Sequence, residues 1–373
     1  MSDGGSRATL AAITLRDFRN FARLELDVPE SGFALVGDNG QGKTNLLEAV
    51  YYLSLFRSMR SARDADLVRF GADAFHVEGD VCTPDRHTIG VGFERATKRK
   101  RVRVDGGASE RLSDALGTLP VVMFAPTDVE LLIGGPGGRR RFLDIMLAVT
   151  ERGYLDALQR YRAALLRRNA ALRDAARRSR TDVTAIAVWE EPLAKHGARL
   201  MSTRRAWVER AHDAYARRME DVGEVGASQI RYVCRTQEDG VDDEAALRAA
   251  LERRRPSDMR FGLTHSGPHR DDLQMLLDGH DLRAFGSAGQ QRSAAIALRS
   301  IEADTLRAAR GVSPVFLLDD PFAELDADRS ARVLALLQRE GASQTILAVP
   351  RDSDIPARLT TLPRRRIARG VIT

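Results

Sequence analysis

A glycine-rich stretch with a lysine near its end, LVGDNGQGKTN, lies between two apolar runs of the chain. It fits the pattern G-x-x-x-x-G-K-[ST], which binds nucleotide phosphates when a strand precedes it and a helix follows. Glycine lets backbone N–H groups approach a phosphate closely, and the N-terminus of the following helix adds a positive dipole. The residues expected to bind the nucleotide are Gly37, Asp38, Asn39, Gly40, Gln41, Gly42, Lys43 and Thr44.

Two side chains of this stretch carry specific chemistry. Lys43 is expected to contact the β- and γ-phosphate oxygens, and the hydroxyl of Thr44 is expected to ligate Mg²⁺. The predicted ligands are therefore ATP and Mg²⁺. The alternative is a glycine-rich turn between a strand and a helix, in which the lysine is accidental.

A pair of acids far along the chain supplies the carboxylates that such a site needs. In SPVFLLDDPFAELD, four apolar residues precede Asp319 and Asp320, as at the end of a buried strand. Asp319 is expected to hold Mg²⁺ through water, and Asp320 to polarise the attacking water as a general base. Two solvated acids at an ordinary strand end are the alternative. Roughly 270 residues separate the loop from the acids, so a large insertion must interrupt the nucleotide-binding core.

A second helix start suited to an anion occurs in FGSAGQQRSAAIALRS. Ser287, Ala288, Gly289 and Gln290 open this helix, with Ser287 as its N-cap. Because the phosphate loop already binds one nucleotide, the second helix start suggests a grip on the ATP of another subunit, through Ser287, Gly289 and Gln290. An ordinary capped helix is the alternative.

The elements that must position these residues alternate between strands and helices. Residues 140–220 are rich in Ala, Leu and Arg at helical spacing, which predicts two or three long helices. A hairpin is predicted with its turn at residues 105–107. Strand character is found at residues 12–28, 32–37, 75–81, 87–93, 228–235, 272–277, 314–320 and 344–349, and further helices are predicted after Gln290 and over 330–340.

These elements predict an α/β fold in three successive parts. Residues 1–140 form the N-terminal part of an ATPase core with the phosphate loop, and residues 141–225 form an arm-like helical insertion. Residues 226–373 form the C-terminal part of the core, with the second helix start and the strand-end acids. The core is expected to be a mixed sheet with flanking helices.

The composition is that of an ordinary globular protein with a basic surplus. Apolar residues make up 43% of the chain, charged residues 29%, and the formal net charge is +6. Only four of the 58 basic residues are lysine, so the charge alone leaves DNA or RNA binding undecided. Two cysteines, no signal peptide and no apolar run long enough to span a membrane indicate a cytoplasmic, bacterial-type protein.

Three motifs in this order, GDNGQGKTN, GSAGQQRS and LLDDPFAELD, resemble the ATP-binding-cassette (ABC) class that includes the SMC proteins. Further stretches resemble the RecF family of bacterial recombination-mediator ATPases more closely. Among these are LRDFRNFARLEL, RSMRSARDADLVRFG and, with the highest specificity, GGRRRFLD and GPHRDD. They cover most of residues 10–330.

This resemblance implies an ABC/SMC-type P-loop ATPase head and an ATP-dependent homodimer that binds DNA at single-strand/double-strand junctions or gaps. The homodimer would act in the repair of gapped or stalled replication intermediates and in SOS induction, and would help RecO and RecR to load RecA on single-stranded DNA. On matched positions, residues 37–44 are the nucleotide loop, residues 287–290 the signature motif, and Asp319 and Asp320 the strand-end acids. Asp326 would line the dimer interface near the ATP.

Three positions depart from the wider ABC class. Ala288 stands where the signature usually has glycine, Asp320 replaces the usual glutamate at the base position, and TILAVPRDSD contains no switch histidine. We therefore expect weak, DNA-stimulated ATP hydrolysis, with DNA binding as the main role.

Two basic clusters are candidates for contacts with DNA phosphates. A strand with a solvated basic edge and a charged helix surface are the respective alternatives. The clusters are Lys98, Arg99, Lys100 and Arg101, in a run that continues to Arg103, and Arg139, Arg140 and Arg141.

His265 and His269 are four residues apart in THSGPHRDD, which on a helix would suggest zinc. Gly267 and Pro268 rule out a regular helix, and no third ligand is obvious. We therefore expect a rigid loop here.

Three other functions share parts of the pattern. The ATPase subunit of a transporter would have the loop, the signature and the acids, but also a switch histidine. An SMC-like structural ATPase needs hundreds of heptad residues. An ATP-regulated nuclease needs a further acidic cluster for two metals. DNA-stimulated ATPase activity would separate the repair function from the transporter function.

Overall fold

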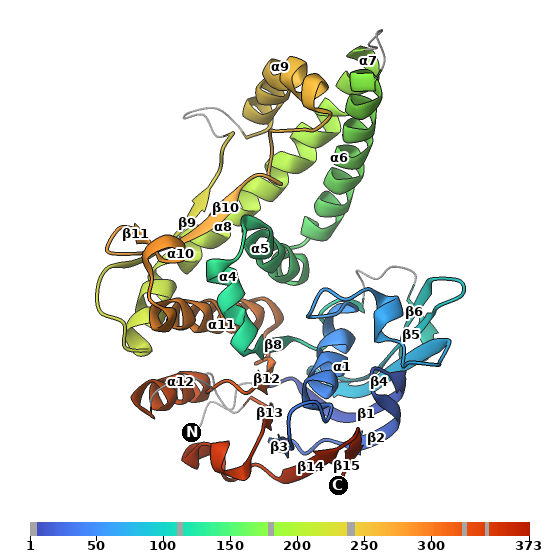
Figure 1. Ribbon diagram of the computed structural model, residues 1–373, viewed down its shortest axis with the longest axis vertical. Helices are drawn as coiled ribbons and strands as arrows, with labels where there is room; N and C mark the ends of the chain where they lie inside the picture. The colour runs from blue at the N-terminus through green and yellow to red at the C-terminus, as the bar shows by residue number, and fades with distance from the viewer. Residues whose placement is uncertain (1–5, 110–114, 178–182, 237–242, 323–326, 340–342) are drawn as a thin grey trace. The chain divides into compact units, whose positions relative to one another are not determined.

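The computed structural model describes residues 6–109, 115–177, 183–236, 243–322, 327–339 and 343–373 (Figure 1). The chain forms two compact units. The first comprises Met1–Asp128, Asp221–Gly223 and Ala295–Thr373, and the second comprises Val129–Glu220 and Glu224–Ala294. The second unit is therefore an insertion in the sequence of the first.

The first unit contains a six-stranded sheet in the order β15-β14-β3-β13-β12-β8. The five strands from β14 to β8 are parallel, and β15 is antiparallel to β14. Parallel strands covered on both faces need near-continuous apolar sequences, such as the VFLLD of β12. The strands are β3 (Gly32–Val36), β8 (Val121–Phe124), β12 (Val315–Asp319), β13 (Thr345–Val349), β14 (Arg364–Ala368) and β15 (Val371–Ile372).

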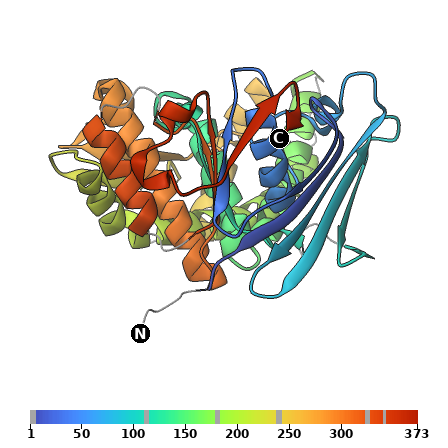
Figure 2. The same cartoon turned by 90° about the horizontal axis from the view of Figure 1, so that it is seen from below.

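A second six-stranded sheet of the first unit is antiparallel, in the order β2-β1-β4-β5-β6-β7 (Figure 2). Helix α1 (Lys43–Leu55) contacts strands of both sheets, and ten of its thirteen residues are buried. A helix that is buried nearly all round must lie in a core. The strands are β1 (Thr9–Phe18), β2 (Phe21–Asp27), β4 (Ala74–Cys82), β5 (Arg86–Glu94), β6 (Arg99–Val104) and β7 (Gly107–Ala108). The described helices of this unit further include α2 (Asp64–Leu67) and α12 (Ala327–Arg339).

Two turns in the antiparallel sheet require left-handed backbone. The strand character predicted over residues 12–28 is divided between β1 and β2, because Asp17 and Arg19 have φ of 49° and 53° and the chain reverses there. The predicted hairpin turn at residues 105–107 is confirmed. Asp105 and Gly106 have φ of 52° and 77°, as a type I′ turn requires.

The second unit is mostly helical and holds a three-stranded sheet, β11-β10-β9 (Figure 1). The long helices predicted over residues 140–220 are α5, α6 and α8, of 15, 24 and 32 residues. The elements are α4 (Glu130–Ile133), α5 (Pro136–Thr150), α6 (Tyr154–Arg177), α7 (Val183–Ala187), α8 (Glu190–Asp221), α9 (Asp243–Phe261), α10 (Leu282–Phe285), β9 (Ser228–Val233), β10 (Asp272–Leu277) and β11 (His280–Asp281). Helix α11 (Ala288–Arg310) continues from this unit into the first.

Residues 226–294 group differently from the predicted three-part division. The sequence analysis assigned them to the C-terminal part of the core, whereas they belong to the second unit. The reason is packing, since β10 contacts α5, and α9 contacts α6. None of the described helices is long and apolar enough to cross a membrane.

Candidate nucleotide-binding site

The phosphate loop occupies the turn between the end of β3 and the start of α1. Gly40 and Gly42 have φ of 81° and 113°, which side chains other than glycine rarely adopt. A Cβ atom on Gly42 would lie 2.4 Å from Asn20 Nδ2, and one on Gly37 would lie 2.5 Å from the carbonyl oxygen of Ile367. Close approach to other parts of the chain therefore requires glycine at both positions.

Two distant turns hold the loop through Gln41. The Gln41 carbonyl oxygen accepts hydrogen bonds from Asn20 Nδ2 at 3.2 Å and from the Gly370 backbone N–H at 3.0 Å. The Gln41 side-chain oxygen accepts from the Arg369 backbone N–H at 2.7 Å. Asn45, in α1, donates to Asn20 Oδ1 at 2.8 Å. The β1–β2 turn and the β14–β15 turn thus fix the loop from outside it.

A cavity of about 260 Å³ opens beside the loop in the first unit. It brings together Lys43 and Thr44 from the loop and Asp319 and Asp320 from the end of β12. The parallel pairing of β12 with β13, and of β13 with β3, puts the carboxyl ends of these strands at one edge. The lining residues are Asn39, Gly40, Gly42, Lys43, Thr44, Asn45, Arg60, Asp319, Asp320 and Pro350.

Lys43 is almost completely enclosed, with 7% of the residue exposed. Its ammonium group donates to the carbonyl oxygens of Gly37 and Asp38, the latter at 3.0 Å. Burial lowers the pKa of Lys43, and the carboxylates of Asp319, Asp320 and Asp38 act against this fall. The carboxylates therefore favour the cation that a phosphate site needs.

The two acids have different surroundings. Burial raises the pKa of the Asp319 carboxyl, while a hydrogen bond from Thr44 and the charges of Arg60 and Lys43 lower it. The Thr44 hydroxyl and the Asp319 carboxyl are thus adjacent oxygen atoms, of the kind that Mg²⁺ binds together with phosphates and water. Asp320 has φ of 46°, and its backbone N–H donates to the Ala348 carbonyl at 2.9 Å.

The signature residues begin α11 in the second unit. The Ser287 hydroxyl accepts from the Gln290 backbone N–H at 3.2 Å, and the Gln290 side chain accepts from the Ser287 N–H at 2.9 Å. This reciprocal pair is a capping box, which explains the predicted N-cap. Ser287 and Ala288 are exposed, and Gly289 and Gln290 are half-buried. Asp326 lies outside the described residues.

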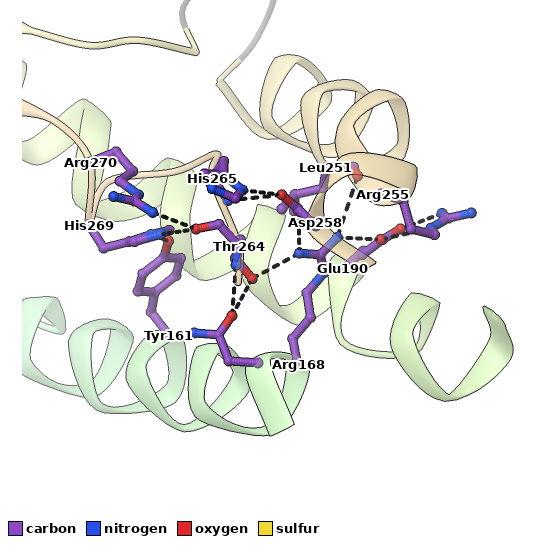
Figure 3. Close-up of polar contacts among 11 residues, drawn as sticks. Tyr161, Arg168, Glu190, Leu251, Arg255, Asp258, Thr264, His265, His269 and Arg270 are labelled. Atoms are coloured by element: carbon purple, nitrogen blue, oxygen red, sulfur yellow. Dashed lines mark hydrogen bonds and ion pairs between the residues drawn. The ribbon is translucent and has the colours of Figure 1, made fainter. Parts of the chain in front are cut away.

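The two histidines bind to protein groups within the second unit (Figure 3). His265 Nδ1 bonds to the buried Asp258 at 2.7 Å, and Asp258 also accepts from the fully buried Arg168. His269 Nε2 donates to the Thr264 carbonyl at 3.0 Å, so its Nδ1 accepts from the Tyr161 hydroxyl at 2.6 Å. These contacts hold the THSGPHRDD segment on α6 and α9.

In the basic cluster at 139–141, Arg139 is not available for the DNA contact that the sequence analysis predicted. Arg139 is 3% exposed, pairs with both oxygens of Asp272 at 2.7 and 2.9 Å, and donates to three carbonyls of α4 and the turn that follows it. Arg140 donates to the Asp271 carbonyl at 2.7 Å, and Arg141 is half-buried. A buried, fully paired guanidinium is unavailable to DNA, so the prediction for Arg139 is wrong.

The cluster at 98–101 is split by the alternation of strand β6. Lys98, Arg99 and Arg101 are exposed. Lys100 points inward, pairs with Asp64 at 2.8 Å, donates to the Phe56 carbonyl and lies over the Tyr52 ring. Lys100 is therefore a structural residue, and the exposed members remain candidates for DNA contacts.

A family comparison matches residues 9–355 to the RecF/RecN/SMC N-terminal domain. The protein "DNA replication and repair protein RecF" of Salinibacter ruber is 35% identical, with 95% of this chain and 88% of that one covered. The RecF of Acidothermus cellulolyticus is 37% identical, with 93% and 95% covered. This chain belongs to the RecF family. Its role lies in DNA replication and repair, as the resemblance implied.

Solved structures agree with this family. The recombination mediator RecF bound to ATP has a TM-score of 0.90 at 27% identity, over 100% of this chain and 99% of that one. An SMC head domain from Pyrococcus furiosus has a TM-score of 0.56 at 16% identity, which shows a shared fold alone. The predicted fold class, an ABC/SMC-type ATPase head with a helical insertion, is confirmed.

Four residues of the site were missed in the sequence analysis. Arg60 and Asn45 line the cavity, Asn20 holds the loop, and Pro350 follows β13 at the cavity wall. Arg60 and Asn20 lie in RSMRSARDADLVRFG and LRDFRNFARLEL, two of the stretches that resemble the family outside the three motifs. The resemblance of these stretches to the family was the sequence feature that could have identified Arg60 and Asn20.

Proposed function

We propose that this RecF-family chain binds ATP with Mg²⁺ in its first unit, dimerises with ATP bound, and then clamps DNA at gapped or stalled replication intermediates. The observation that carries the proposal is one cavity that gathers the phosphate loop, Asp319, Asp320 and Arg60. The ATP-bound RecF relative supports the nucleotide, and the curated relatives' role in DNA replication and repair supports the DNA.

The proposal gives each of these groups a separate role in ATP binding or hydrolysis. Backbone N–H groups of the loop bind the β-phosphate, and Lys43 exchanges the carbonyls that it contacts for β- and γ-phosphate oxygens. Thr44 and Asp319 would hold Mg²⁺, which neutralises phosphate charge. Asp320 accepts the proton of the water that attacks the γ-phosphate.

Hydrolysis is slow in this proposal. An aspartate is one methylene shorter than glutamate, so its carboxylate reaches less far toward the water. Pro350, directly after β13, offers no side-chain donor to the γ-phosphate. Because phosphoryl transfer depends on positioning, both features favour a long-lived ATP state.

The dimer contact in this proposal uses the exposed start of α11. Ser287, Gly289 and Gln290 grip the ATP of a second copy of this chain. The solved relatives are described as part of the RecFOR pathway, which supports RecO and RecR as partners. RecA as the protein loaded rests on the resemblance to the family alone. Work on chromosomal DNA implies a cytoplasmic location.

The deciding experiment is analytical ultracentrifugation with and without ATP and a gapped DNA. We expect a dimer only with ATP, and DNA that sediments with it. Ser287→Arg should bind ATP normally and remain a monomer, because the larger side chain blocks the partner's nucleotide. Ser202→Arg, at an exposed position of α8, is the matched control. A Ser287→Arg variant that dimerises like the wild type would reject the shared site.

Two rival functions meet specific obstacles. An SMC-like structural ATPase needs long coiled-coil arms, and the longest described helix has 32 residues. Among the described residues, no group of three or more His, Cys, Asp and Glu side chains suits a two-metal nuclease. Stimulation of ATP turnover by DNA, without incision of labelled DNA, would support the proposed clamp over a transporter subunit or a nuclease.

A further inference from the structure

A phenylalanine on the surface of the first unit is left almost wholly in solvent. Phe70 is 99% exposed, the highest value among the exposed large apolar side chains of the described residues. Single exposed apolar residues are common on protein surfaces, so exposure alone assigns nothing. Phe70 is distinguished by the hydrogen bonds that hold its turn and by the basic hairpin to which the neighbouring segment is bonded.

The turn that carries Phe70 is firmly held. The Ala72 N–H donates to the Arg69 carbonyl at 3.0 Å, and Gly71 has φ of 83°, as in a type II turn with Phe70 at its second position. Arg69 is fixed twice to Asp17, by its backbone N–H to the carbonyl at 2.8 Å and by Nε to the carboxylate at 2.6 Å. The ring is therefore presented on a braced support.

The segment beside this turn is tied to the basic β5–β6 hairpin. The Arg95 backbone N–H donates to the Asp73 carbonyl at 2.8 Å, and the Arg95 guanidinium donates to the Ala65 carbonyl at 3.1 Å. The hairpin exposes Lys98 and Arg99 next to Arg95. An aromatic ring and solvated cations on connected segments are the combination that binds single-stranded nucleic acid.

The β1–β2 turn connects this surface to the nucleotide site. Asp17 holds Arg69, and Asn20, three residues later, donates to the Gln41 carbonyl of the phosphate loop at 3.2 Å. One turn thus supports both the loop that would bind ATP and the turn that presents Phe70. A change at the phosphate loop thus has a short route to the ring, through these hydrogen bonds and the backbone of the β1–β2 turn.

We propose that Phe70 stacks on an unpaired DNA base at a single-strand/double-strand junction, while Arg95, Lys98 and Arg99 contact neighbouring phosphates. Inside a continuous duplex both faces of each base pair are covered, so a phenyl ring has no face to stack on. An unpaired base at a gap offers one, whatever its sequence. This inference rests on the proposed binding of gapped DNA and assigns Phe70 as the residue that distinguishes a gap from continuous duplex.

The test compares two DNAs in the presence of ATP. One is a gapped duplex with 2-aminopurine as the first unpaired base, and the other is a continuous duplex. Phe70→Ala should lose roughly ten-fold or more in affinity for gapped DNA, with the 2-aminopurine quenching lost and duplex affinity unchanged. Phe70→Trp should keep both signals. Phe261→Ala, which removes an exposed phenylalanine of the second unit, should behave as wild type.

Different failures have different meanings. Phe70→Ala affinities that match the wild type on both DNAs, or fall equally on both, overturn the stacking but leave DNA binding intact. A wild-type protein that binds neither DNA overturns the proposed function as well. Weaker binding of a fluorescent ATP analogue without DNA would assign the ring to adenine, and loss of the ATP-dependent dimer would assign it to a second copy. Either result rejects the DNA assignment.

Discussion

The Lys43 side chain is almost completely shielded from water. Burial alone would favour the neutral amine, and the carboxylates of Asp319, Asp320 and Asp38 favour the ammonium. Lys43→Ala removes the cation that faces the phosphates. We expect a loss of ten-fold to more than a hundred-fold in ATP affinity, since a hydrogen bond to a charged group contributes about 1.5–3 kcal/mol. Titration with a fluorescent ATP analogue measures it.

Two variants sharpen the Lys43 experiment. Lys43→Arg should keep part of the affinity, because the planar fork of arginine replaces a point charge imperfectly. Lys195→Ala removes an exposed lysine of α8 and should bind as wild type. Wild-type affinity in Lys43→Ala would show that the loop does not bind the nucleotide through this residue.

Arg139 contributes stability rather than DNA binding. Its guanidinium is buried and pairs with both oxygens of Asp272. Arg139→Ala leaves that carboxylate without its partner, and we expect the free energy of unfolding to fall by about 3 kcal/mol. Urea denaturation measures the loss, with Arg101→Ala on the exposed face of β6 as the control. A stable Arg139→Ala protein with weakened DNA binding would contradict this assignment.

His269 makes the second unit sensitive to acid. Burial lowers the pKa of His269 to about 4, from an ordinary value of 6.5. Between these values the unfolded chain binds a proton that the folded chain does not, so stability present above pH 6.5 is lost as pH falls toward 4. The loss approaches about 3 kcal/mol, at 1.36 kcal/mol for each pKa unit.

The same residue offers a test of this pH dependence. His269→Gln removes the titrating group, so its unfolding free energy should fall less between pH 7 and pH 4.5 than that of the wild type, by about 2 kcal/mol. Its stability at pH 7 should also be lower, because the bonds with Tyr161 and Thr264 change. If the unfolding free energies of the two proteins fall equally as the pH is lowered, another residue causes the acid sensitivity.

The residues that sequence reasoning placed correctly in the cavity are those with local requirements. The phosphate loop needs its glycines, lysine and threonine within eight positions, and the acids follow one apolar strand. Arg139 was misplaced because its partner Asp272 is 133 positions away, and no local pattern distinguishes a buried arginine from a solvated one. The roles of the placed residues remain predictions.

At the scale of elements, the β14–β15 hairpin is an unpredicted part of the nucleotide site. Its turn donates two backbone hydrogen bonds to Gln41, through Arg369 and Gly370. Every residue except proline has a backbone N–H, so the residue types of the turn could not predict this contact. Packing likewise decided the grouping of β9, α9 and β10 with the helical unit, although β9 and β10 have clear strand character.

Substitution at Gly370 tests this hairpin as a support of the loop. Gly370 has φ of 80°, and a Cβ atom would lie 3.1 Å from both Asn20 Nδ2 and the Asn20 carbonyl oxygen. Gly370→Ala should displace Asn20 and the loop, and lower ATP affinity several-fold. Gly106→Ala is the matched control, because its φ is 77° and its Cβ would meet nothing within 4 Å.

The two glycine variants separate strain from contact. Both should lose stability of about 1 kcal/mol, because alanine is unfavourable at positive φ. Only Gly370→Ala should bind the fluorescent ATP analogue more weakly. Equal ATP affinities in the two variants would mean that the hairpin turn does not position the loop.

At the scale of the whole molecule, the predicted ATP-binding motifs are divided between the two units. The phosphate loop and the strand-end acids lie in the first unit, and the signature residues lie in the second. The family match and the ATP-bound relative support ATP as the ligand. For a clamp, the relevant property is the lifetime of the ATP state, which Asp320 and Asp319 should affect in opposite ways.

Asp320→Asn should keep ATP binding and dimerisation but prolong the residence of DNA, because only the proton acceptor is lost. Asp319→Asn should weaken Mg²⁺-dependent ATP binding itself, since it removes the carboxylate beside Thr44. Misplacement of the attacking water by about 1 Å costs on the order of 100-fold in rate, so wild-type turnover should already be slow. Stopped-flow DNA release and steady-state turnover measure both effects. Wild-type turnover of tens per second, as in efficient phosphoryl-transfer enzymes, or DNA release indifferent to Asp320→Asn, would reject the clamp.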